Sequence, residues 1–195
     1  MHVKQRGIAL RARPGGRVVG RVGPRTAYGS PLTMPVVRTR KGRWLGVVTP
    51  AMPNGRLAWI DGQAGGLRFT RTRIVLRVDL SQRTIAVRNG GHTIRRIHVA
   101  VGRRGTATPT GRFAVTDKLP GRQYGSSYGC CILALSGWQT RLPSGWRGPG
   151  RLAIHGSPRQ DAGGATSLGC LHAGPRDLRY LMRVVPVGAQ VIIRR

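Results

Sequence analysis

Short apolar runs separated by turns constrain this chain to a fold made mainly of strands. Thirty glycines and thirteen prolines are spread over 195 residues, which exceeds average usage and breaks the chain wherever a long helix could extend. The stretch 74–79 places Ile74, Leu76 and Val78 on one face, the alternation typical of a half-buried strand. The sequence therefore predicts a mainly β protein with short strands.

The turn signals divide the chain into two units. Residues 1–68 hold several short strands at close spacing, which suggests a small barrel. Asn54-Gly55 is a strong hairpin signal between two of these strands. A glycine-rich linker at 62–66 ends this unit, and a second unit follows over residues 69–195.

The second unit is expected to contain strands and a single helix. Residues 118–150 are rich in Gly, Pro, Ser and Tyr and lack periodicity, so we expect a long functional loop there. Pro175 can open a helix, and Leu178, Leu181 and Met182 give that helix one apolar face.

The formal net charge of +29 is extreme, because 34 Lys and Arg face five acidic residues. One interpretation is the neutralisation of nucleic-acid phosphates, and a second is attraction to an anionic envelope polymer or membrane surface. The arginines are scattered rather than gathered in one tract, which favours a compositional habit without a binding role. No apolar run is long enough to span a bilayer.

The three cysteines are too few for a disulfide framework. Cys130 and Cys131 are adjacent, and a bridge between neighbours is strained, so we expect two buried apolar residues, with a lid or redox role as the alternative. A zinc site from these two with Cys170 and His155 would lack the usual C-x-x-C spacing. Cys170 is left as a candidate nucleophile.

The segment 154–172 holds the strongest chemical signal. His155 ends an apolar run, and Cys170 follows 15 residues later after a loop of Gly, Pro, Ser and Asp. An imidazole that takes the proton of a thiol is the minimal apparatus of nucleophilic catalysis. Ser167 and Gly169 suit a tight turn whose backbone N–H groups could hold an oxyanion. We expect the positive charge of the protein to favour the thiolate.

Three features together resemble the catalytic domain of the L,D-transpeptidases, the YkuD family. They are Val101-Gly102 followed by the stretch 108–113 (Thr-Pro-Thr-Gly-Arg-Phe), then Ile154-His155-Gly156, then the stretch 167–171 (Ser-Leu-Gly-Cys-Leu). The resemblance covers roughly residues 70–195 and implies a β-sandwich with one helix cradling the active-site strand. Residues 1–68 resemble the SH3-like domains that precede such domains in actinobacterial envelope proteins.

The resemblance implies an acyl transfer on peptidoglycan stem peptides. Cys170 matches the nucleophile that attacks the carbonyl of the third stem residue and expels D-Ala, and His155 matches the general base. The acyl group would then pass to a side-chain amine of a second stem, which forms a 3→3 cross-link. Ser167 would help orient the site, and the N–H groups of Gly169 and Cys170 would form the oxyanion hole. No metal or cofactor is expected.

Two positions depart from the family pattern. Leu168 stands where some members carry His, and His172 stands where Arg or Asn is frequent. We expect both to contact substrate, together with Tyr128 and Trp138 of the long loop. His172 could instead be the base, but its offset of two from Cys170 favours His155.

Other functions are compatible with parts of this pattern. An L,D-carboxypeptidase or another Cys-His hydrolase of wall peptides would use the same pair, whereas a basic wall-binding or nucleic-acid-binding protein would not need it. We expect peptidoglycan stem peptides as partners, anionic wall polymers as a further possibility, and no specific nucleic acid. This substrate implies an extracytoplasmic location, in the cell wall or a periplasm-like space. Because no secretory signal is visible, we expect a missing or mis-assigned N-terminus.

Overall fold

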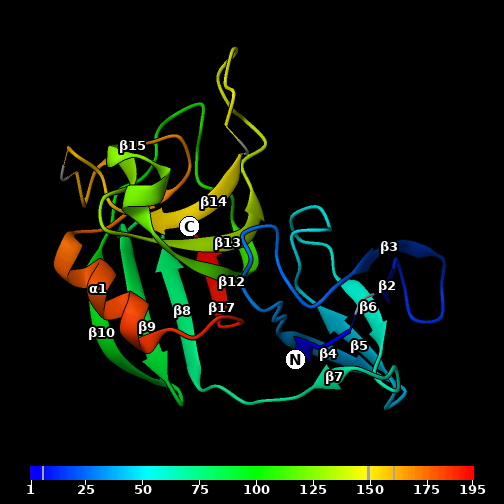
Figure 1. Cartoon of the computed structure of the whole chain (residues 1–195). Coiled ribbons are helices and arrows are strands. Elements are labelled where there is room, and N and C mark those ends of the chain that lie inside the picture. The colour runs from blue at the N-terminus through cyan, green and yellow to red at the C-terminus, as the bar shows by residue number, and fades with distance from the viewer. Residues whose placement is uncertain (6, 149, 160) are drawn as a thin grey trace.

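The computed structural model describes residues 1–5, 7–148, 150–159 and 161–195, and it consists mainly of strands (Figure 1). The first unit holds β1 (His2–Val3), β2 (Ile8–Arg11), β3 (Val18–Val22), β4 (Val36–Arg40), β5 (Trp44–Val47), β6 (Ala58–Asp61) and β7 (Leu67–Arg68). The strands of the second unit are β8 (Ile74–Asp79), β9 (Thr84–Asn89), β10 (His92–His98), β11 (Val101–Gly102), β12 (Gly111–Pro120), β13 (Cys131–Trp138), β14 (Arg151–His155), β15 (Ala165–Ser167), β16 (Leu171–His172) and β17 (Gln190–Arg194). Its helices are the 3-10 helices η1 (Gly121–Tyr124) and η2 (Ser126–Tyr128) and the α-helix α1 (Pro175–Val184). The predicted mainly β class is confirmed.

Residues 1–68 form their own sheets around their own core. β3, β2, β6, β5 and β4 make a five-stranded antiparallel sheet, and β1 pairs with β7. The predicted turn at Asn54-Gly55 is confirmed within the β5–β6 connection, where the N–H of Arg56 donates to the carbonyl of Pro53 at 3.0 Å. The apolar side chains that form this core cluster are Met1, Val3, Ile8, Leu10, Leu32, Met34, Val47, Ala58 and Ile60.

The long strand β12 joins the two halves of the eight-stranded sheet of the second unit. Its first half pairs with β17 and its second half with β13, so eight strands follow the order β10-β9-β8-β17-β12-β13-β14-β16. Most neighbours are antiparallel, but β17 runs parallel to β8 and β14 runs parallel to β16. Apolar side chains of both halves meet in one core, and the unit is a β-sandwich. This core includes Phe113, Leu133, Leu135, Ile154 and Val191.

The predicted helix is confirmed as α1, which packs against β13. Pro175 occupies its first turn, Leu178 and Leu181 are fully buried, and Met182 packs at the edge of the core. Within the described ranges, no helix has the length and apolar character needed to cross a membrane.

The prediction of a continuous loop over residues 118–150 is wrong. β12 continues to Pro120, and residues 131–138 form the central strand β13, buried along nearly its whole length. A strand covered on both faces needs apolar side chains at every position, so it shows no alternation. The continuous apolar run Cys-Ile-Leu-Ala-Leu at 131–135 is therefore the sequence signal of a strand buried on both faces, although it lacks the alternation of a half-buried strand.

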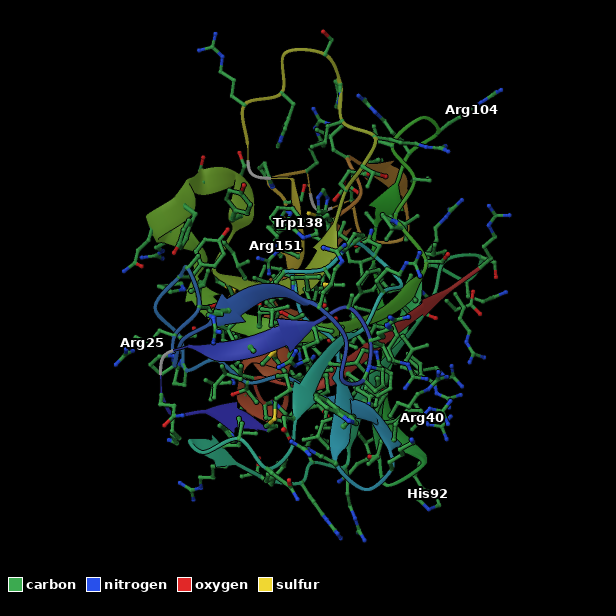
Figure 2. The ribbon with its side chains drawn as sticks, turned by 90° about the vertical axis from the view of Figure 1, so that its right-hand side faces the viewer. Arg25, Arg40, His92, Arg104, Trp138 and Arg151 are labelled. Atoms are coloured by element: carbon green, nitrogen blue, oxygen red, sulfur yellow. A yellow bond between two sulfur atoms is a disulfide. The ribbon has the colours of Figure 1, made fainter. Side chains whose placement is uncertain are left out.

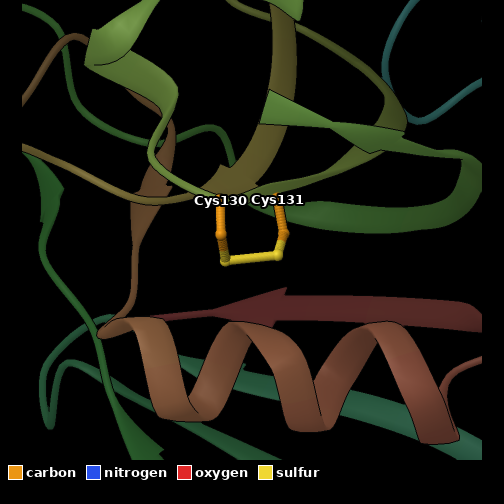
Figure 3. The surroundings of a disulfide bond; sticks show 2 residues. All are labelled: Cys130 and Cys131. Atoms are coloured by element: carbon orange, nitrogen blue, oxygen red, sulfur yellow. A yellow bond between two sulfur atoms is a disulfide. The ribbon is translucent and has the colours of Figure 1, made fainter. Parts of the chain in front are cut away.

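Cys130 and Cys131 are joined by a disulfide, which lies on the side of β13 that faces α1 (Figure 3). The expected burial is confirmed for Cys131, and Cys130 packs against the same core. The expectation of two unpaired apolar thiols is wrong. The bond also removes both thiolates from the zinc alternative.

The two units are joined by hydrogen bonds at the end of β13. The side chain of Asn54 donates to the carbonyl of Trp138 at 2.7 Å and accepts from its N–H at 2.9 Å. The indole N–H of Trp138 donates to the carbonyl of Pro50 at 2.8 Å. A second contact joins the hydroxyl of Thr26 to the buried carboxylate of Asp117.

Candidate active site

Two parallel strands bring the predicted catalytic residues together. His155 ends β14, and Cys170 lies directly before β16; the register pairs His155 with His172 and Ile154 with Leu171. The loop between the strands folds back over the site, as its 15-residue offset predicts. A pocket of about 450 Å³ results. Its lining includes six of the residues expected at the site: Tyr128, His155, Ser167, Leu168, Cys170 and His172.

The imidazole of His155 is held in one orientation by the backbone. His155 is 7% exposed, and its Nδ1 donates to the carbonyl of Gly156 at 2.5 Å. In the neutral ring this leaves Nε2 as the basic nitrogen. The carbonyl of Gly156 therefore orients this ring.

Two aromatic rings flank this imidazole and shield it from solvent. The ring centroid of Tyr128 lies 4.9 Å from that of His155, and the centroid of His172 lies 4.7 Å away. Burial, and then the positive charge that His172 can carry, lower the pKa of His155 to about 4. His155 is therefore a neutral base across the physiological range.

The thiol of Cys170 is also neutral in this structure. It packs beside Leu119, Ile132 and Ala153, and its Sγ donates weakly to the carbonyl of Arg151 at 3.8 Å. Burial raises the pKa of Cys170 to about 11. The expectation of a thiolate favoured by the positive charge of the protein is wrong. The pair is suited to general-base catalysis, in which His155 removes the proton as the sulfur attacks.

Ser167 shapes the turn before Cys170. Its hydroxyl donates to the carbonyl of Cys170 at 2.6 Å and accepts from the N–H of Gly169 at 3.0 Å. The N–H of Gly169, expected in the oxyanion hole, is therefore already bonded to Ser167, and its role toward an oxyanion stays a prediction. The N–H of Cys170 makes no hydrogen bond within the described residues and remains the candidate oxyanion donor.

The side-chain amide of Gln139 holds the backbone of this turn, a role that sequence reasoning missed. Its buried side-chain amide donates to the carbonyls of Leu168 and Thr106, each at 3.0 Å. Gly169 has a φ of 120°, and a Cβ there would lie 2.2 Å from the amide nitrogen of Gln139. The glycine is thus required both by backbone conformation and by space. No motif in the sequence near Gln139 indicates this role.

A carboxylate that the sequence analysis also missed stands beside His172. Asp161 accepts from His172 Nδ1 at 3.1 Å and also accepts from the hydroxyl of Thr166. Burial opposes ionisation of this carboxyl, but the hydrogen bonds from Thr166 and His172 still lower the pKa of Asp161. Asp161 precedes His172 by 11 residues, so only the fold of the loop brings the two together.

Trp138 lies outside this pocket. Its indole is bonded to Pro50 of the first unit, and the guanidinium of Arg151 covers its ring at 5.0 Å (Figure 2). The prediction that Trp138 lines a substrate groove is wrong, because the end of β13 faces the first unit. Trp146 of the same segment does line the pocket. No group of three or more His, Cys, Asp or Glu side chains is placed to hold a metal ion in the described part of the chain.

Comparisons with known proteins agree with this geometry. Residues 73–193 match the model of the YkuD family, described as the L,D-transpeptidase catalytic domain. A candidate L,D-transpeptidase, YkuD, of Bacillus licheniformis is 29% identical over 119 residues, which cover 60% of this chain and 64% of that protein. The chain therefore spans slightly less than two thirds of this relative.

Solved structures show the same fold. The L,D-transpeptidase from Mycobacterium smegmatis gives a TM-score of 0.55 at 17% identity, over 100% of this chain and 95% of that chain. L,D-transpeptidase 3 from Mycobacterium tuberculosis gives 0.53 at 16% identity, over 71% of this chain and 74% of that chain. The family match begins at residue 73, so the SH3-like nature of residues 1–68 and the boundary after residue 68 stay predictions.

Proposed function

This chain belongs to the YkuD family of L,D-transpeptidase catalytic domains, and we propose that it transfers peptidoglycan stem peptides through a thioester on Cys170. The donor is a tetrapeptide stem that loses its terminal D-Ala, and the acceptor is the side-chain amine of a second stem. The product is a 3→3 cross-link. The observation that carries this proposal is a neutral imidazole and a single free thiol lining one pocket, together with the family match.

The first half-reaction uses both neutral groups. Sγ of Cys170 attacks the carbonyl carbon of the third stem residue while its proton moves to Nε2 of His155. The N–H of Cys170 stabilises the oxyanion that develops. When the tetrahedral intermediate collapses, the carbon–nitrogen bond to D-Ala breaks and His155 returns the proton to the leaving amine. The low pKa of His155 suits this return, because the imidazolium gives up its proton readily.

The remaining parts of the proposal concern setting and partners. The reaction places the protein outside the cytoplasm, in the cell wall or a periplasm-like space, where peptidoglycan lies. The first unit is proposed as an SH3-like module that holds the catalytic unit near the wall. The net charge of +29 would favour anionic wall polymers as a further partner. Elution of the protein from isolated walls by rising salt tests that contact.

The decisive experiment measures intact-protein mass after incubation with a disaccharide-tetrapeptide. The wild type should gain the mass of the substrate minus D-Ala, and Cys170→Ala should gain nothing. Release of D-Ala without a cross-linked product would assign the activity to an L,D-carboxypeptidase. The transferase proposal fails if the wild type forms no adduct and releases no D-Ala; binding to walls that survives in Cys170→Ala would then indicate a wall-binding protein.

A further inference from the structure

The pocket carries one carboxylate in a chain that has very few. The chain has five acidic residues, and among the described residues Asp161 is the acidic side chain that lines the pocket, together with Arg151 and Arg159. An alkyl amine has a pKa of about 10 and enters as an ammonium at neutral pH. In this pocket such an acceptor meets the positive charges of Arg151 and Arg159, which repel it. Asp161 is the negative charge available to it in this pocket.

Asp161 also fixes the neighbouring imidazole. Its two oxygens lie 3.1 and 3.2 Å from Nδ1 of His172, and the two side chains keep only 11% and 16% of their exposure. Thr166 holds the carboxylate from the other side. Because Nδ1 carries the bonded proton, Nε2 of His172 has a lone pair, and it makes no hydrogen bond to any described residue. An available base therefore borders the pocket two residues after the nucleophile.

His155 and His172 have different surroundings. Burial and the neighbouring ring disfavour a charge on His155. A charge on His172 lies against the carboxylate of Asp161, which offsets it. With ring centroids 4.7 Å apart, the two imidazoles cannot both be charged without strong repulsion.

We propose that Asp161 and His172 form the acceptor site, in which Asp161 attracts the ammonium of the incoming stem and Nε2 of His172 removes a proton from it. This inference rests on the proposed function, because it concerns the second half of that reaction. The resulting amine attacks the thioester carbonyl and forms the new carbon–nitrogen bond. The carbon–sulfur bond breaks, and its electron pair goes to Sγ of Cys170. His172 first releases its proton to solvent, and His155 then transfers a second amine proton to Sγ, so the two imidazoles are not charged together.

The test separates the two half-reactions. The donor is a tetrapeptide whose side-chain amine is acetylated, and the acceptor is a separate tripeptide stem with a free amine. Mass spectrometry follows the thioester, and chromatography follows hydrolysed donor and cross-linked product. The variants are His172→Gln, which keeps a donor toward Asp161 but cannot take a proton, and Asp161→Asn. The matched control is Asp79→Asn, whose carboxylate accepts from Ser81 and Gln82 in a turn and does not line the pocket.

Acylation should stay within about threefold of wild type in every variant. His172→Gln should lower the rate of transfer to the amine by about a hundredfold, the usual contribution of a general base. Asp161→Asn should raise the acceptor concentration needed for half-maximal transfer by about tenfold, the range of a charge-assisted hydrogen bond. Hydrolysis of the thioester should continue in both, so the ratio of transfer to hydrolysis falls. Asp79→Asn should leave that ratio unchanged.

Each other outcome has a defined meaning. Wild-type transfer in His172→Gln and Asp161→Asn would overturn the acceptor site and leave the proposed function standing. An equal loss of acylation and transfer would also overturn it, because the dyad would then act in the first half-reaction or in folding. If the melting temperature of Asp161→Asn is well below that of the wild type, the ratio of transfer to hydrolysis in His172→Gln decides the proposal. Absence of a thioester in the wild type would overturn both proposals.

Discussion

The protonation state of the Cys170–His155 pair can be measured on the free enzyme. The pKa of Cys170 is raised to about 11 and that of His155 is lowered to about 4, so a proton moved between them crosses about seven pKa units. At about 1.4 kcal/mol per unit this costs up to about 10 kcal/mol before the attraction between the two charges is counted. A step of about 1 s⁻¹ has a barrier of roughly 17 kcal/mol. A preformed ion pair would take a large share of that barrier, so we expect proton transfer and attack to occur together.

Alkylation by iodoacetamide reports the thiolate directly. Cys170 is the free cysteine of the described residues, so one added mass identifies its reaction. With a thiol pKa of about 11, roughly one molecule in ten thousand is a thiolate at pH 7, and the alkylation rate should rise about tenfold per pH unit up to pH 10. Acylation by the tetrapeptide should instead be flat from about pH 5 to 9, with a fall near pH 4 where His155 gains a proton.

His155→Gln is the control that distinguishes the two states. For a neutral pair, removing the imidazole should change the alkylation profile by less than about one pH unit, because no imidazolium stabilised the thiolate. A thiolate–imidazolium pair would behave differently: the wild type would alkylate at a constant rate from about pH 6 upward, and this plateau would vanish in His155→Gln. That result would refute the reasoning from burial.

Three further predictions follow from the same structure. The buried neutral His155 has a pKa of about 4 in the fold against about 6.5 in an unfolded chain, so the unfolded state binds more protons between these values. Stability should therefore fall by up to about 3 kcal/mol as the pH drops from 7 through 4, and urea unfolding of His155→Gln should show a smaller loss; an equal loss in both would contradict this. Gly169→Ala should destabilise the fold by about 1–3 kcal/mol and abolish acylation, because φ is 120° and Gln139 lies in the way; a wild-type melting temperature and acylation rate would contradict the close contact. Asn54→Ala removes two hydrogen bonds to the backbone of Trp138 and should cost about 1–3 kcal/mol in thermal unfolding, whereas an unchanged transition would show that the contact between the units contributes nothing.

Local signals in the sequence located the parts of the site that depend on short spacing. A histidine at the end of an apolar run and a cysteine after a small-residue turn predicted a loop that folds back, and β14 and β16 place both residues on one pocket. The helix after Cys170 was predictable because Pro175 and the apolar spacing of Leu178 and Leu181 are contained within one segment. Such features need no knowledge of the rest of the chain.

Parts of the site that depend on distant contacts were not predictable. β13 is covered on both faces, so its apolar run had no period, and its end carries Trp138 toward the first unit rather than into the pocket. Gln139 reaches the carbonyl of Leu168, 29 residues away in the sequence. Asp161 meets His172 across a loop. In each case the packing of the strands determines which residues meet, and no local motif marks the polar residue in the sequence.

Burial, rather than the net charge of the protein, determines the direction in which the pKa of the Cys170 thiol shifts. A net charge of +29 suggested a field that stabilises a thiolate, yet the pKa of Cys170 is raised. Charges on exposed arginines are screened over about 8 Å in physiological salt, whereas the loss of water around Sγ acts at contact distance. Sγ packs beside Leu119, Ile132 and Ala153, and burial is the largest cause of the raised pKa of Cys170, which a hydrogen bond from the backbone of Ala153 only partly offsets. Desolvation consequently outweighs the long-range field, and the total charge of the chain does not predict the ionisation of the Cys170 thiol.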